Sequence, residues 1–166
     1  MKTKTQKIVL SSLFTAIICI ATLVIKIPTP LKGYINLGDG MVLLAGWLLP
    51  LPYAFLASAI GSLLADVFLG YVIYAPATFI IKGLMAIVVQ ICYKSLSSKS
   101  HRITSCILSA LLAEILMIGG YYIFEGFLYG FAPSLVNIPA NSMQALAGIV
   151  VGTIFINVFK NQKIFK

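Results

Sequence analysis

The chain has 166 residues, 60% of them hydrophobic and only 10% charged, and its mean hydropathy is +1.04. Soluble globular domains carry about 25% charged residues, so the composition excludes a soluble domain and indicates an integral membrane protein. The net charge of +8 does not predict nucleic-acid binding, because the cations flank apolar segments, where they contact anionic lipid headgroups and determine topology.

Nine of the twelve Lys and Arg residues form three clusters, separated by long apolar segments. The clusters are Lys2, Lys4 and Lys7; Lys94, Lys99 and Arg102; and Lys160, Lys163 and Lys166. Lys and Arg in short loops mark the cytoplasmic side of a membrane protein. An even number of crossings must therefore separate each pair of clusters, and both termini are predicted to be cytoplasmic.

Six apolar segments follow in chain order, and a crossing takes about 20 residues. The predicted helices cover residues 8–25, 40–49, 53–71, 76–93, 103–127 and 135–159. The second is short for a crossing, but parity requires it, and Asp39 is predicted to cap its start. Pro28, Pro52, Pro76 and Pro133 mark the intervening breaks. The sequence thus predicts one all-α domain over residues 1–166, with six transmembrane helices.

Polar side chains of the apolar segments gather in the half that the basic clusters place outside. They are Asn36, Asp39, Asp66, Lys82, Glu125, Asn137, Asn141 and Gln144, with Glu114 near the middle of its helix. An ionisable group in a bilayer is costly unless it is paired or faces a cavity. The pattern therefore predicts a ligand cavity open to the outside, and Tyr121 and Tyr122 are candidates for stacking on a flat ligand.

Each polar group also has a structural interpretation. Lys82 and Asp66 can form a pair that ties two helices together, and Glu125 can be an interfacial loop acid. Asn141 and Gln144 can join helices through their amides. The sequence does not choose between these roles and ligand binding.

No Gly-x-x-x-x-Gly-Lys-Ser/Thr sequence is present, so no P-loop for ATP is expected. The only histidine is His101, in the predicted cytoplasmic linker, and the three cysteines form no paired motif. We therefore predict no metal site, no cofactor and no enzymatic activity. A passive channel, a proton-coupled exporter with Glu114 as proton carrier, and the binding subunit of a larger assembly stay open.

The first predicted helix carries small residues at helical spacing near its cytoplasmic half. Ser12 and Ala16 lie one turn apart, and small residues at this spacing let another helix approach closely. The approaching helix can belong to a partner or to the same protein.

Four stretches carry a resemblance to a known family. They are SLFTA at residues 12–16, INLGDG at residues 35–40, APATFIIKG at residues 75–83 and NSMQALAG at residues 141–148. Together with six helices in about 170 residues, they make the chain resemble the substrate-binding S components of energy-coupling factor (ECF) vitamin transporters over its full length. Within that family it looks most like the riboflavin-type branch, which includes hydroxymethylpyrimidine and pyridoxine transporters.

The resemblance implies a multi-pass protein of the bacterial cell membrane that captures a vitamin and works with a transmembrane coupling (T) subunit and two cytoplasmic ATPases. Ser12 and Ala16 correspond to the family's Ala-xxx-Ala docking pair, with Ser12 departing from the pattern. The best-matching substrates are pyridoxine and hydroxymethylpyrimidine, with riboflavin as the alternative. By position, the implied substrate-binding residues are Asn36, Lys82, Glu114, Tyr121, Asn141 and Gln144.

Overall fold

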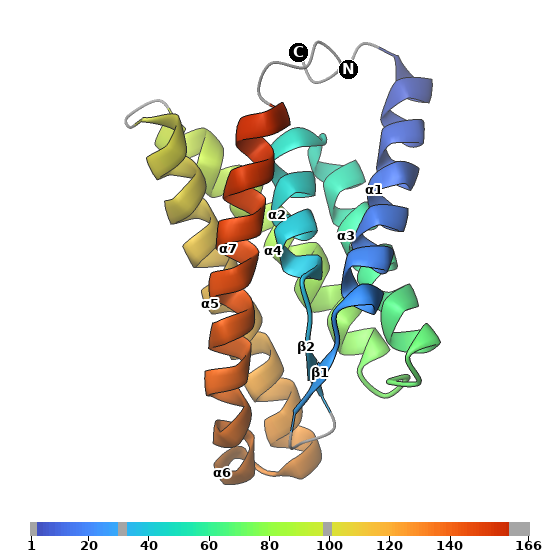
Figure 1. Cartoon of the computed structure of the whole chain (residues 1–166), viewed down its shortest axis with the longest axis vertical. Helices are drawn as coiled ribbons and strands as arrows, with labels where there is room; N and C mark the ends of the chain where they lie inside the picture. Colours follow the sequence, from blue (N-terminus) through green and yellow to red (C-terminus); the bar gives the residue numbers. More distant parts are fainter. Residues whose placement is uncertain (1–2, 30–32, 98–100, 160–166) are drawn as a thin grey trace.

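In the computed structural model, residues 3–29, 33–97 and 101–159 are described, and their helices pack side by side into one bundle (Figure 1). The elements are α1 (Lys4–Val24), β1 (Ile27–Pro28), β2 (Tyr34–Ile35), α2 (Gly38–Leu48), α3 (Leu51–Phe68), α4 (Ala75–Ser97), α5 (Arg102–Tyr129), α6 (Phe131–Ser134), a 3-10 turn η1 (Leu135–Asn137) and α7 (Ile138–Phe159).

Five helical stretches of the described chain are long and apolar enough to cross a membrane: α1, α3, α4, α5 and the continuous stretch from α6 through α7. Many large apolar side chains on their outer surfaces are exposed, as expected for a bundle that faces lipid. The chain is therefore a multi-pass membrane protein. The α2 helix has 11 residues and rises only about 16 Å, so a sixth crossing stays a prediction.

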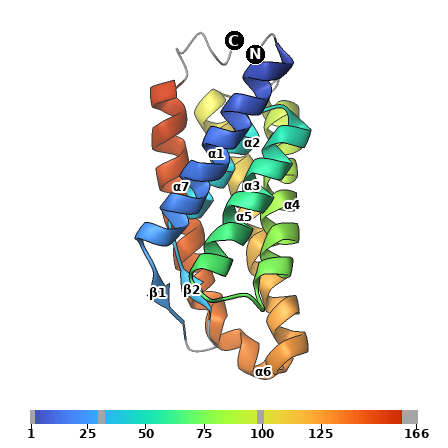
Figure 2. The same cartoon turned by 90° about the vertical axis from the view of Figure 1, so that its right-hand side faces the viewer.

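The start of α1, the end of α4, the start of α5 and the end of α7 lie at one end of the bundle (Figures 1 and 2). Parity of the three basic clusters predicts this arrangement. Lys2, Lys99 and the cluster Lys160, Lys163 and Lys166 lie outside the described residues. The cytoplasmic orientation of the termini stays a prediction.

The short α2 helix is buried almost all round, because the longer helices enclose it. Its close approach to α4 depends on Gly46, where an added Cβ would come within 2.0 Å of the Val89 side chain. Its end is held by Gln90 of α4, whose Nε2 donates to the carbonyls of Gly46 at 3.1 Å and Leu49 at 2.5 Å. Carbonyls at a helix end need such partners when they are buried.

We expect Gln90→Leu to lower the free energy of unfolding by about 1–3 kcal/mol, because it leaves buried carbonyls of α2 without donors. The exposed neighbour Ile91 provides the control variant Ile91→Leu, which should unfold like the wild type. Denaturant unfolding in detergent micelles measures both. Equal stabilities for the two variants would contradict the assigned role of Gln90.

Below α2 in Figure 1, the space beside the longer helices is filled by the segment that connects α1 to α2. Its ends pair as a two-stranded antiparallel ribbon, with Ile27 opposite Ile35 and Pro28 opposite Tyr34. The sequence predicts only a polar loop here, so the strand pairing was not expected. The ribbon lies beside the lower part of α7, below α2 (Figure 1).

Two local predictions are wrong. Asp39 does not cap α2, because the helix already begins at Gly38 and the Asp39 side chain bonds elsewhere. The last predicted helix does not begin at Leu135 as one α-helix, since residues 131–137 form α6 and a 3-10 turn first. Pro139 explains the break, because proline lacks the N–H of a helix interior and fits the first turn, which places the start of α7 at Ile138.

Candidate functional site

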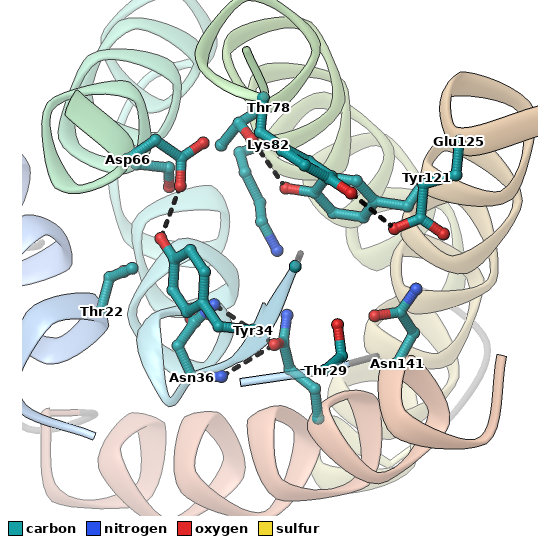
Figure 3. A pocket seen from close by; sticks show the side chains of 14 residues that line it. Thr22, Thr29, Tyr34, Asn36, Asp66, Thr78, Lys82, Tyr121, Glu125 and Asn141 are labelled. Atoms are coloured by element: carbon teal, nitrogen blue, oxygen red, sulfur yellow. Dashed lines mark hydrogen bonds between the residues drawn. The ribbon is translucent and has the colours of Figure 1, made fainter. Parts of the chain in front are cut away.

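A polar cavity lies beside the start of α2. It is enclosed by α1, α3, α4, α5 and α7 and by the segment between α1 and α2 that contains β1 and β2. Figure 3 shows its side chains converging from these elements. The lining residues are Thr22, Thr29, Gly33, Tyr34, Asn36, Ser62, Asp66, Tyr74, Thr78, Lys82, Tyr121, Glu125, Asn141 and Gln144. Buried polar groups from so many elements in an apolar bundle are the usual mark of a functional site in a membrane protein.

An ion pair between Lys82 and Asp39 forms the inner side of the site. Lys82 Nζ donates to Asp39 Oδ1, and the two side chains are 3% and 0% exposed. Lys82 Nζ also lies 5.5 Å from the centroid of the Tyr121 ring, within the range of a cation–π interaction. The interpretation that Lys82 pairs with Asp66 is therefore wrong. The start of α2 carries Asp39 to the depth of Lys82.

Gln144 of α7 connects this ion pair to the loop before α2. Its Nε2 donates to Asp39 Oδ2 at 2.7 Å, and its Oε1 accepts from the backbone N–H of Asn36 at 2.8 Å. Asn36 Oδ1 in turn accepts from the Gly38 N–H at 2.9 Å. This bond satisfies one of the N–H groups at the start of α2 that have no partner within the helix. The loop, α2 and α7 are thus held in one hydrogen-bonded network.

A second group of contacts lies on the α3 and α4 side of the cavity. The Tyr34 hydroxyl donates to Asp66 Oδ1 at 2.5 Å, and the hydroxyls of Thr78 and Tyr121 bond each other at 3.0 Å. Burial, with the nearby Asp66 carboxylate adding to it, raises the pKa of Tyr34 above its ordinary value. Tyr34 therefore stays protonated and able to donate at any physiological pH.

Glu125 is buried, so its interpretation as an interfacial loop acid is wrong. Its Oε1 accepts from Asn137 Nδ2 at 2.8 Å and from the Tyr74 hydroxyl at 3.3 Å, and its side chain is 2% exposed. The 3-10 turn η1 places Asn137 against α5. Glu125 lines the cavity from the α5 side (Figure 3).

Glu114 lies deeper in the bundle, behind the ion pair. It is 1% exposed, and neither of its carboxylate oxygens has a hydrogen-bond partner. It lies within electrostatic range of Lys82 and Asp39. An added Cβ at Gly148 of α7 would come within 2.8 Å of its Oε1, so a glycine is needed there to make room.

The cavity is small. The centres of water molecules can occupy only about 30 Å³ of it, so the cavity has room for about two waters. A vitamin-sized molecule therefore requires the walls to move apart. The wall formed by Gly33, Tyr34 and Asn36 belongs to the connection between α1 and α2 rather than to a membrane-spanning helix.

The structure brings five of the six predicted substrate-binding residues to this one cavity: Asn36, Lys82, Tyr121, Asn141 and Gln144. Glu114 is not among the lining residues but lies next to the Lys82–Asp39 pair. That these residues bind a substrate stays a prediction.

Sequence reasoning counted Asp66 and Glu125 among the polar groups that predict a cavity but not among the substrate-binding residues, and it did not include Tyr34 and Thr78 in the site. For the two acids a signal existed, because both are rare carboxylates at the same predicted depth as Lys82. Tyr34 and Thr78 carry no such signal, because a loop tyrosine and a helical threonine are common in membrane proteins.

The predicted docking pair on α1 is exposed. Ser12 and Ala16 both face outward, while α1 packs against α3 through its other side, where Gly61 lies close to Thr15 and Ile18 (Figure 2). The interpretation that Ser12 and Ala16 pack inside the same protein is therefore wrong.

The sequence matches the family model described as "ECF-type riboflavin transporter, S component" over residues 2–161. It is also similar to a protein of Pyrococcus woesei described as "Uncharacterized protein in gap 3'region", with 33% identity over 137 residues, or 81% of this chain and 88% of the relative. That description assigns no function, so the family match carries the functional argument. It confirms the resemblance at the level of the family, which is one of transporter subunits rather than enzymes.

Proposed function

Because the chain belongs to the family of ECF-type riboflavin transporter S components, we propose that it captures a small water-soluble vitamin or vitamin precursor for import by an ECF-type ABC transporter. The observation that carries this proposal is the cavity itself. Five helices and a loop direct buried polar side chains to one place near one end of an otherwise apolar bundle. In a membrane protein, this many desolvated polar groups indicates a ligand path or a binding site.

We propose pyridoxine or hydroxymethylpyrimidine as the substrate, with riboflavin as the alternative. A flat ring can stack on the tyrosines of the cavity, and Lys82 Nζ has donors beyond the one used by Asp39. The small cavity volume favours a single-ring compound, because a three-ring compound requires a larger displacement of the walls.

The partners that this proposal requires are a transmembrane T subunit and two cytoplasmic ATPases. S components of this family act with T and ATPase subunits, and the present sequence contains no P-loop of its own. The exposed side of α1 that carries Ser12 and Ala16 is the proposed contact with the T subunit. Next to it, Leu13 and Ile17 of α1 help to line an apolar groove of about 450 Å³ against α2 and α7.

Ligand binding by the purified chain tests the proposed function. We expect at least one of pyridoxine, pyridoxamine, hydroxymethylpyrimidine, thiamine and riboflavin to raise the unfolding temperature of the protein in detergent, with no ATPase present, because a ligand that binds only the folded state stabilises it. Mass spectrometry of any co-purified small molecule identifies the natural ligand independently. The absence of a shift with every compound would contradict capture of a B-type vitamin.

A proton-coupled exporter is the second candidate, and the buried Glu114 carboxyl without hydrogen-bond partners is the observation that favours it. Membrane vesicles that contain this chain alone separate the two. A capture subunit gives no flux without its partners. Flux that follows a proton gradient and disappears in Glu114→Gln would instead establish the exporter.

A further inference from the structure

The cavity has more hydrogen-bond acceptors than donors to satisfy them. Three buried oxygens of lining residues have no hydrogen-bond partner: Asp66 Oδ2, Glu125 Oε2 and Thr29 Oγ1. The Thr78 hydroxyl lies against Asp66 and also bonds the Tyr121 hydroxyl, and its single proton can go to only one of the two. Throughout the described residues, every buried side-chain atom without a partner is an oxygen. Of the three in the cavity, the carboxylate oxygens of Asp66 and Glu125 need donors, whereas the Thr29 hydroxyl can either accept or donate.

Most buried donors of the site already have an acceptor, although Lys82 Nζ keeps N–H groups beyond the one that Asp39 accepts. Lys82 Nζ and Gln144 Nε2 both donate to Asp39, and Asn36 Nδ2 donates to Gln144 Oε1 at 3.2 Å. A ligand composed mainly of acceptors could bond the remaining N–H groups of Lys82 and the Asn141 amide. It would leave the carboxylate oxygens Asp66 Oδ2 and Glu125 Oε2 without donors. A ligand with N–H groups would find free acceptors.

Charge leads to the same conclusion. Lys82 is neutralised by Asp39, which is the ion pair found within the described residues. Asp66 and Glu125, at 3% and 2% exposure, have no cation within ion-pair distance in that part of the chain. Buried carboxylates are costly unless hydrogen bonds or positive charge compensate them. A ligand with N–H donors supplies that compensation.

The two acids also lie at different parts of the cavity. Asp66 is on the α3 side beside Tyr34, and Glu125 is on the α5 side beside Tyr74 and Asn137, with the Lys82 side chain directed to the space between them (Figure 3). A ring in this space would have one edge toward each acid and a face toward the tyrosines, where aromatic rings attract positive charge.

We propose that the substrate is a small amino-substituted heterocycle, neutral or cationic, whose N–H groups donate to Asp66 and Glu125. This inference rests on the proposed function and deepens it, because it separates amino compounds from their hydroxyl and oxo counterparts. An amino group brings several N–H donors and, when protonated, a positive charge, whereas a hydroxyl brings one donor and an oxo oxygen only accepts. Lys82 would then face a ring nitrogen or a hydroxyl oxygen of the same molecule.

Matched pairs of compounds test this inference on the wild-type chain. The pairs are pyridoxamine with pyridoxine, and hydroxymethylpyrimidine with its analogue in which an oxo group replaces the amino group, with riboflavin as a third reference. Calorimetry in detergent gives each Kd. We expect the amino member of at least one pair to bind at least about tenfold tighter, the usual size of a hydrogen bond to a charged group.

Two isosteric variants then assign the acids. Asp66→Asn and Glu125→Gln should each reduce the preference for the amino compound toward unity while leaving the affinity for the hydroxyl or oxo compound within about threefold, because an amide replaces an acceptor-only carboxylate by a group that also donates. Thermal unfolding of each variant shows whether it is folded, and the comparison on the wild-type chain does not depend on them.

The outcomes separate the two proposals. Equal or tighter binding of the hydroxyl and oxo members, or of riboflavin, would overturn the amino-heterocycle inference and leave vitamin capture standing. Retention of the full preference in both variants would overturn the roles of Asp66 and Glu125. Failure of every compound to bind would remove the proposed function, and this inference with it.

Discussion

Replacing Lys82 by methionine should both destabilise the protein and weaken ligand binding. The substitution keeps the length of the side chain but removes the ammonium group that neutralises Asp39, whose side chain is fully buried. Removing one partner of a buried ion pair typically costs about 3–5 kcal/mol, because the remaining charge is left uncompensated. Unfolding in detergent measures this loss. The Kd for the ligand should rise at least about tenfold, since a hydrogen bond to a charged group disappears.

Two double variants identify the acid that pairs with Lys82. We expect Lys82→Met with Asp39→Asn to recover much of the lost stability, because no unpaired buried charge remains. Lys82→Met with Asp66→Asn should not recover it, since Asp66 bonds Tyr34 rather than Lys82. Ligand affinity should stay low in both double variants. Recovery by Asp66→Asn alone would contradict the observed pairing.

Replacing Ala16 by leucine should strongly reduce transport and leave ligand binding intact. Ala16 is exposed on α1, so a larger side chain finds space in the isolated protein. In the complete transporter, the same side chain would prevent close contact with a helix of the T subunit. Overpacking costs about 1–3 kcal/mol, so transport should fall about 5- to 150-fold. Vitamin uptake by cells and the Kd of the purified protein provide the two measurements.

Gly119→Leu on α5 is the matched control. An added Cβ there meets no atom within 4 Å, so the variant adds similar bulk to an open part of a different helix. It should transport and bind like the wild type. If Ala16→Leu also lost ligand binding, or if both variants transported normally, α1 would not be the docking helix.

The membrane class, the long helices and most of the polar site could be predicted because each depends on local properties of the chain. Lys82, Tyr121, Asn141 and Gln144 were predicted as site residues because polar side chains are rare within apolar segments and need a reason to be there. The same reasoning reached Glu114, although the structure places it behind the cavity rather than in its lining.

The partner of Lys82 could not be predicted in this way. Asp39 and Asp66 are both carboxylates at a suitable predicted depth, and only the position of α2 distinguishes them. Gly46 lets α2 approach α4 closely, and Gln90 holds its end, so that Asp39 meets Lys82. Asp66, which does not pair with Lys82, instead accepts a hydrogen bond from the Tyr34 hydroxyl.

The sequence alone therefore determined that the protein is a helical membrane protein, which segments are apolar, and in which half the polar groups gather. Hydropathy and clustered charge act on each segment separately, and the bilayer responds to them without reference to the rest of the fold. Only the tertiary structure decided which acid neutralises Lys82 and which acids keep free acceptors toward the cavity. Those contacts depend on the rotation and depth of each helix, which are set by packing between residues far apart in the chain.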